Sequence, residues 1–291
     1  MAVNLALSAL SLASFYFILS AGLSLVFGVM EILNFANAGV FVTGVYTGWA
    51  LTRLHWPIIW AILAAFIIGG FVSALFERVL IAPLYKNPLG QLLTTLGIML
   101  ILDELVNWIF GPQIQQDNES GWISGVVHWG GMPFPLYRLF VIAVGIVIWL
   151  GLIVILRYTR FGLLLRAGVE SRVLVDLSGV DVRPLFTLAY ALGGGLAAVA
   201  GTLYGPFGGV YPQAGLDTLV LSFIVVVIGG MGSITGTLLG ALVIGISESV
   251  VGFFVPNLAL TINVLAMLVV LLVRPYGILG LTPGRKDTHA V

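Results

Sequence analysis

Long apolar segments with almost no charge recur along the whole chain, and they constrain its fold more than any other feature. A helix needs about 20 mostly apolar residues to cross the hydrocarbon core of a bilayer. The segments that meet or approach this length are Leu5–Met30, Phe35–Leu54, Pro57–Phe76, Gln91–Phe110, Leu139–Leu156, Leu185–Tyr204, Thr218–Gly230, Thr235–Val255 and Leu258–Val273. Their succession predicts an integral membrane protein with many helical spans.

The composition suits an apolar solvent better than water. Hydrophobic residues make up 60% of the chain and charged residues 8%, whereas an average soluble domain carries about 25% charged residues. A soluble domain of 291 residues could not bury so much apolar side chain, but a bilayer can accommodate it. The formal net charge of zero gives no indication of nucleic-acid binding, and the absence of cysteine excludes disulfides and thiolate metal sites.

The predicted fold class is all-α, a polytopic transmembrane helical bundle of about eight to nine spans with one or two broken helices. Gly229, Gly230 and Gly232 interrupt the end of the short seventh segment. The second segment is alternatively a broken or re-entrant helix, which lowers the number of spans. No linker rich in Pro or Ser and no block of charge divides the chain, so residues 1–291 are expected to form a single transmembrane domain.

Basic residues predict the orientation. Residues 157–183 contain five arginines, and Lys or Arg also occurs in residues 78–86 and 274–286, whereas the loops 111–137 and 205–217 contain neither. Cytoplasmic loops carry an excess of Lys and Arg. The C-terminus is therefore expected in the cytoplasm and the N-terminus outside, with Arg53 as a mild exception to the rule.

Catalytic motifs are absent from the sequence. It contains no GxxxxGK[ST] phosphate-binding loop, no HExxH, no GxSxG and no CxxC. The three histidines, His55, His128 and His289, show no spacing typical of metal ligands. The chain is therefore expected to be neither an enzyme nor a metalloprotein.

The arginine-rich segment contains a short amphipathic helix after Gly162. Leu165, Val169, Arg172, Val173 and Asp176 share one side at helical spacing, and Gly179 is placed as a stop signal. A basic amphipathic helix between two spans can lie on the lipid surface. It can equally dock into a groove of a partner protein, and its residues alone leave both possibilities open.

Four stretches in the same order carry a resemblance to a known family. They are residues 22–36 (GLSLVFGVMEILNFA), residues 77–84 followed by 93–97 (ERVLIAPL, LTTLG), residues 160–180, and residues 229–236 (GGMGSITG). Together they resemble bacterial high-affinity branched-chain amino acid ABC transporter permeases of the LivH type. Departures occur at Asn37, Ala38 and Gly39 and within residues 175–178, and they leave the exact substrate open.

This resemblance implies a permease subunit of an ATP-binding-cassette importer in the bacterial inner membrane. Such a subunit forms the path for branched-chain or related amino acids that a periplasmic binding protein delivers. It holds no cofactor, because ATP and Mg bind to partner ATPase subunits, and it pairs with a second, paralogous permease within membrane lipid. Residues 157–184 would couple to the ATPase through Arg160, Phe161, Gly162, Leu165, Arg166, Val169, Glu170, Val173, Leu177 and Gly179.

Other functions remain possible at this point. The same architecture suits a permease for urea, short amides or another small polar solute. A stand-alone secondary transporter or channel is a second class, although it leaves the arginine-rich helix without an evident role.

Two interrupted segments are candidates for the substrate path, since broken helices in transporters free backbone groups to meet a substrate. The candidate residues are Glu31, Asn34, Asn37, Gly229, Gly230, Gly232 and Ser233. Alternatively, Glu31–Asn37 is only a tight cytoplasmic turn.

Three ionisable residues fall within predicted spans: Asp103, Glu104 and Glu248. Such residues are costly in lipid and usually face protein or water. They could contact a substrate ammonium group or gate the path, or they could form hydrogen bonds between helices close to the membrane surface.

Overall fold

The computed structural model describes residues 2–30, 33–85, 87–115, 125–129, 132–170, 181, 183–255 and 259–280. Within these ranges the fold is helical apart from one antiparallel hairpin, β1 (Val126–Trp129) and β2 (Met132–Pro135). The α-helices are α1 (Ala2–Met30), α2 (Ala36–Arg53), α3 (Ile58–Phe76), α4 (Pro88–Phe110), α5 (Leu136–Tyr158), α6 (Arg160–Glu170), α8 (Arg183–Gly208), α9 (Ala214–Gly229), α10 (Ile234–Phe254) and α11 (Ala259–Val273). The expectation of an all-α fold is thus confirmed except for the hairpin.

Six helical stretches in the described residues are long and apolar enough to cross a membrane. They are Val3–Met30, Ile58–Leu84, Pro88–Phe110, Leu136–Tyr158, Arg183–Gly208 and Ile234–Phe254, and shorter apolar helices cover Ala214–Gly229 and Thr261–Val273. At a rise of about 1.5 Å per residue, the 16-residue α9 is shorter than a hydrocarbon core of about 30 Å.

Helix α2 is enclosed by the other helices. It contacts α3, α4, α8 and α9, and most of its first half is buried. Asn37, Thr43 and Thr47 lower its hydropathy, yet the helix tolerates them because protein rather than lipid surrounds it. Thr43 and Thr47 each donate a hydrogen bond from the side chain to a backbone carbonyl of α2 itself.

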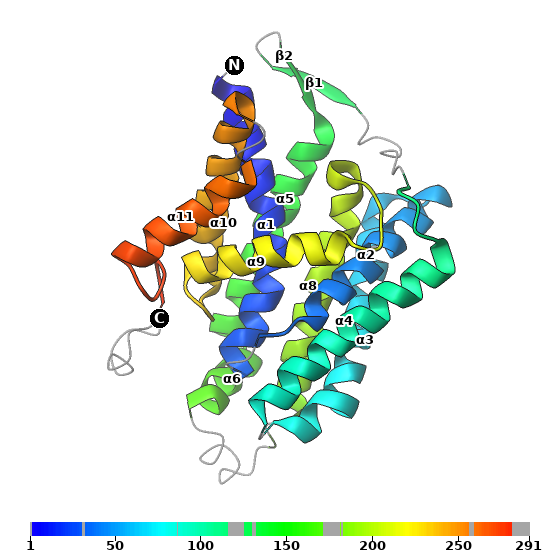
Figure 1. The fold of residues 1–291 in the computed structure, drawn as a ribbon, viewed down its shortest axis with the longest axis vertical. Coiled ribbons are helices and arrows are strands. Elements are labelled where there is room, and N and C mark those ends of the chain that lie inside the picture. Colours follow the sequence, from blue (N-terminus) through cyan, green and yellow to red (C-terminus); the bar gives the residue numbers. More distant parts are fainter. Residues whose placement is uncertain are drawn as a thin grey trace.

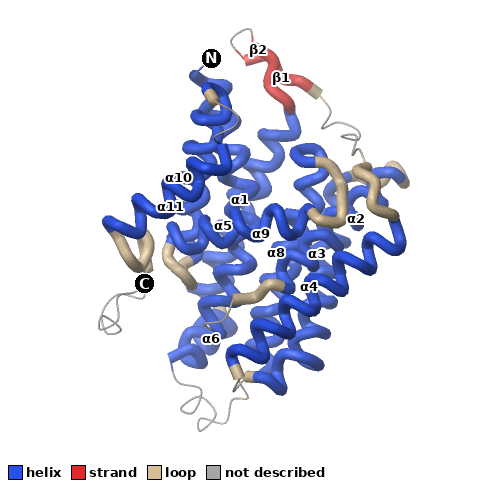
Figure 2. Tube along the Cα trace, in the orientation of Figure 1, coloured by secondary structure: helices blue, strands red, loops and turns tan. Residues whose placement is uncertain are grey.

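The two ends of the molecule carry different elements (Figure 1). The start of α1, the hairpin and the end of α8 lie at the upper end of the view, and α6 lies at the lower end. Helix α9 crosses the front of the molecule almost at right angles to the long axis. Figure 2 shows that the connections from α1 to α2 and from α9 to α10 lie at an intermediate height rather than at either end.

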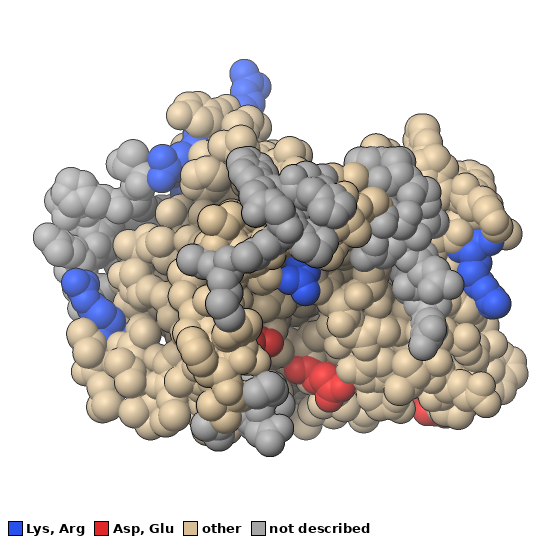
Figure 3. Space-filling model, turned by 90° about the horizontal axis from the view of Figure 1, so that it is seen from above, with Lys and Arg blue, Asp and Glu red and all other residues tan. Residues whose placement is uncertain are grey.

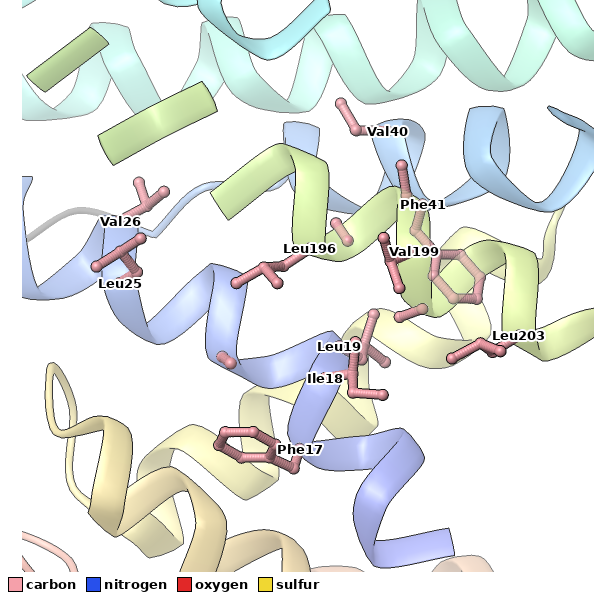
Figure 4. Packing of buried hydrophobic residues seen from close by; sticks show 14 of the residues in the cluster. Phe17, Ile18, Leu19, Leu25, Val26, Val40, Phe41, Leu196, Val199 and Leu203 are labelled. Atoms are coloured by element: carbon pink, nitrogen blue, oxygen red, sulfur yellow. The ribbon is translucent and has the colours of Figure 1, made fainter. Parts of the chain in front are cut away.

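Helices α1 and α8 form the centre of the bundle. Their most apolar windows are 78% and 72% buried, compared with 22% for α5 and 28% for α4. Figure 4 shows side chains of α1, α2 and α8 packed together, including Leu19, Phe41 and Val199. The outward side chains of the peripheral helices are large and apolar, for example Phe71 and Val147, as contact with lipid requires.

Small residues allow the central helices to approach at the backbone. A Cβ atom built on Gly193 would lie 2.8 Å from the carbonyl oxygen of Gly22 on α1. A Cβ on Gly44 of α2 would collide with the backbone of Ala198 on α8, and one on Gly201 would collide with the carbonyl of Phe41. Helix association within a membrane relies on such close packing, since the lipid supplies no hydrophobic driving force between helices.

Candidate transport path and coupling surface

The first interrupted segment separates α1 from α2. Asn34 is buried, and its side-chain oxygen accepts a hydrogen bond from the backbone N–H of Ala36 at 3.1 Å. This bond satisfies one of the N–H groups that the start of a helix leaves without a partner. Asn37 is buried in the first turn of α2, and Glu31 lies outside the described residues.

The second interrupted segment separates α9 from α10. Gly230 and Gly232 have φ angles of +102° and +82°, which side chains other than glycine rarely adopt. Ser233 directly precedes α10 as its N-cap residue, and its hydroxyl accepts a hydrogen bond from the N–H of Gly236 at 3.1 Å. The backbone N–H groups of Ile278 and Leu279 bond to the carbonyls of Ile228 and Gly229, so the described C-terminal segment closes over the end of α9.

The second interruption lies beside the last turn of α1. A Cβ atom on Gly28, in the last turn of α1, would lie 3.1 Å from the Cα atom of Gly232. Ala38 of α2 packs with Met99 of α4 and Leu219 of α9, with Phe35 against them. The sequence predicted both interruptions, and the fold adds that the one after α9 lies against the last turn of α1, whereas the start of α2 packs on α4 and α9.

Asp103 lies on α4, one residue after a side chain that contacts the start of α2. It follows Leu102, which packs against Gly39 at the start of α2. Asp103 is partly buried, and its Oδ1 atom has no hydrogen-bond partner in the part of the chain that the structure describes. Glu104 is exposed and accepts a long hydrogen bond of 3.4 Å from Asn107.

Glu248 belongs to a separate polar cluster. Its Oε2 atom accepts hydrogen bonds from the hydroxyl of Tyr16 on α1 at 2.8 Å and from the side-chain amide of Asn263 on α11 at 3.1 Å. The carboxylate therefore links α10 to two neighbouring helices. This geometry agrees with the interpretation of Glu248 as a hydrogen-bonding group between helices.

Replacing Glu248 by Leu is expected to lower the free energy of unfolding by about 1–2 kcal/mol, because both donors lose their acceptor. Thermal unfolding of the purified protein in detergent measures the change. The control Glu248→Gln keeps one acceptor oxygen, and its free energy of unfolding is expected to fall by less than half of the decrease in Glu248→Leu. A Leu variant as stable as the unchanged protein would contradict this role.

The coupling segment begins with α6, whose two sides differ. Arg160, Leu163 and Arg166 are exposed and lie on one side at helical spacing, with Leu163 62% exposed. Leu165 is 4% exposed and packs in the core of its own chain. Gly162 is buried against Leu156, and Phe161 packs partly against the same core.

This arrangement changes which residues of α6 can meet a partner. Leu165 and Gly162, both predicted as coupling residues, face the permease itself, and the prediction omitted the outward Leu163. The sequence prediction placed the start of this helix after Gly162, whereas α6 begins at Arg160. Helical spacing counted from Arg160 places Leu163 on the same side as Arg160 and Arg166, so the sequence could have indicated it. Val169 and Glu170 end α6, whereas Val173, Leu177 and Gly179 lie outside the described residues.

Comparison with known proteins covers nearly the whole chain. The family model described as branched-chain amino acid transport system / permease component matches residues 5–273. The permease LivH of Salmonella typhimurium, named for high-affinity branched-chain amino acid transport, is 29% identical over 93% of this chain and 92% of its own length. BraD of Pseudomonas aeruginosa, a permease with the same description, is 28% identical over 93% of both chains.

A further relative, named for sugar import, matches a shorter part of the chain. The fructose import permease FrcC of Rhizobium meliloti is 35% identical over 35% of this chain and 31% of its own length. No solved structure matches the chain.

The resemblance predicted from the four stretches is thereby confirmed, as is the expectation of a transport subunit that is not itself catalytic. The multi-pass membrane character of this family agrees with the long apolar helices of the structure. The chain belongs to the family of permease components of branched-chain amino acid transport systems.

Proposed function

We propose that this chain forms the transmembrane path of an ATP-driven importer for branched-chain or related amino acids. The observation that carries this proposal is the family match over residues 5–273, which extends from α1 into α11. The whole of residues 1–291 would act as one transmembrane domain of eight to nine spans, with α2 and α9 as incomplete or tilted spans.

The substrate would pass beside the two interruptions. Both connections lie at an intermediate height between the two ends of the molecule (Figure 2), where a substrate crossing the membrane needs polar groups. Interrupted helices supply such groups from their backbone termini. The buried side chains of Asn34 and Asn37 and the partly buried Asp103 add polar atoms near the start of α2.

The partners would bind at opposite ends. The end with α6 would face the cytoplasm and receive ATPase subunits that hold ATP and Mg, because Arg160, Arg166 and Arg183 are exposed there. The end with the hairpin would face a periplasmic binding protein, and a second, paralogous permease would complete the path. Figure 3 looks onto this hairpin end, and its visible acidic side chains gather toward the lower edge of the view.

The substrate follows from the names of the relatives only as a proposal. LivH and BraD are named for branched-chain amino acids, and each matches over 93% of this chain. FrcC is named for fructose, so the family architecture also admits another small polar solute. Uptake of leucine, isoleucine and valine in competition with fructose and urea would separate these substrates.

Copurification tests the assembly. The C-terminally tagged chain, extracted from its native membrane in mild detergent, is expected to bring down an ATP-binding subunit and a second permease in stoichiometric amounts. Isolation of the chain alone or as a homo-oligomer would contradict the importer and favour a channel or secondary transporter.

A further inference from the structure

A buried carboxylate lies at the turn between α3 and α4. Glu77 begins a π-helical turn, Glu77–Ile81, which is followed by the 3₁₀ turn Ala82–Leu84 and then by α4. Its side chain is 1% exposed. A carboxylate removed from water is costly unless hydrogen bonds compensate it, so the partners of Glu77 determine whether this turn is stable.

Both oxygens of Glu77 are occupied by donors. Oε1 accepts a hydrogen bond from the hydroxyl of Tyr85, within the same turn. Oε2 accepts one from the hydroxyl of Thr187, on α8, at 2.6 Å. The carboxylate therefore joins the α3–α4 turn to a helix more than 100 residues further along the chain.

The first turns of α8 contact this α3–α4 turn through a ring contact and a hydrogen bond. Phe186 packs edge to face on Tyr85, with ring centroids 6.1 Å apart. The same hydroxyl lies 3.2 Å from the carbonyl oxygen of Arg183, the first residue of α8, so its one hydrogen is shared unequally between this carbonyl and the closer Glu77. Helix α8 begins at Arg183, among the last residues of the proposed coupling segment 157–184, so Thr187 lies close in sequence to that segment.

A second donor lies on the same side of α8. Tyr190 follows Thr187 by three residues and therefore shares its helix face. Its side chain is 3% exposed, and its hydroxyl has no hydrogen-bond partner among the described residues. Helix α8 contacts the turn Glu77–Ile81, and Tyr190 lies about one helical turn beyond the donor that Glu77 uses. Tyr190 is therefore a buried donor without a partner in the described residues, one turn along the helix from the donor that Glu77 now uses.

We propose that Glu77 is a positioning residue for coupling, and that its carboxylate switches between the hydroxyls of Thr187 and Tyr190 as the ATPase moves α8. The proposal rests on the proposed importer function. Two discrete hydrogen-bonded arrangements of a buried charge provide the two-state element that transmission between distant sites requires. The switch links movement of α8 to the α3–α4 turn and hence to α4, which borders the path.

The test compares hydroxyl deletions in the reconstituted complex of both permeases, ATPase subunits and binding protein. Thr187→Val keeps the shape of the side chain and removes its donor. Tyr190→Phe removes a hydroxyl that holds no hydrogen bond in this structure. Each is expected to lower the amount of leucine transported per ATP hydrolysed by about tenfold, within the range of coupling between protein sites. Thr187→Ser restores the donor and is expected to restore the ratio.

A matched control lies on the same helix. Thr202 donates from its hydroxyl to the carbonyl of Gly44 on α2 at 3.1 Å. Thr202→Val therefore removes one interhelical bond away from the coupling end, and it should leave the ratio unchanged.

Two outcomes would overturn the switch. One is an unchanged ratio in both Thr187→Val and Tyr190→Phe. The other is a loss of assembled complex with a normal ratio in the complex that remains, which indicates a merely structural bond. Absence of ATP-dependent uptake by the unchanged protein would instead overturn the proposed function itself.

Discussion

Replacing Leu163 by Asp together with Arg166 by Glu is expected to abolish ATP-driven uptake while the protein still inserts into the membrane. Both side chains are exposed on the outward side of α6. A partner that binds this side would lose an apolar contact and meet reversed charge. Two such changes at the centre of an interface are expected to cost about 3–5 kcal/mol, which reduces ATPase binding by more than about a hundredfold. Copurified ATPase and uptake of labelled leucine are the measurements.

The controls separate partner binding from folding. The resemblance assigned Leu165 to the coupling surface, but Leu165 is 4% exposed and packs in the protein core. Leu165→Asp alone is expected to reduce the amount of folded protein. Leu54→Asp places a charge on a 67% exposed side chain in the turn between α2 and α3, away from α6, and should leave ATPase binding intact. Uptake above half the normal rate in the Leu163/Arg166 variant would contradict the α6 surface.

Replacing Gly201 by Leu is expected to prevent folding of the bundle. Its Cβ atom would collide with the carbonyl of Phe41 and lie 2.7 Å from the backbone nitrogen of Val45. Backbone atoms cannot move aside as a flexible side chain can, so α8 and α2 must separate. The expected cost is about 3 kcal/mol or more, measured as the yield of monodisperse protein in detergent and as its unfolding temperature.

Two glycines in open positions supply the controls. Cβ atoms on Gly97 of α4 and Gly151 of α5 would meet no atom within 4 Å. Leu at either position is expected to leave the yield unchanged, because leucine is the better helix former. Equal yields of Gly201→Leu and Gly151→Leu would show that the α2–α8 contact does not limit assembly.

The apolar segments predicted the helices well, because the length of an apolar run depends only on consecutive residues and not on the rest of the fold. Each of the nine segments coincides with a helix, and residues 229–233 separate α9 from α10 as expected. The hairpin β1–β2 was missed, since its strands are only four residues long and their pairing joins separate parts of a loop. Glu77 appeared only as part of a family-like stretch, and nothing local indicated that Thr187 would meet it.

The sequence by itself determined that the chain enters a membrane, where its helices lie and to which family it belongs. Tertiary structure alone decided that the interruption after α9 lies against the last turn of α1, that α2 is enclosed by protein, that Leu165 faces inward and Leu163 outward, and that Glu77 joins α8. The physical reason is that lipid and protein interior are about equally apolar. The apolar pattern therefore sets which segments are helices that enter the membrane, whereas the side of each helix that faces protein depends on its neighbours.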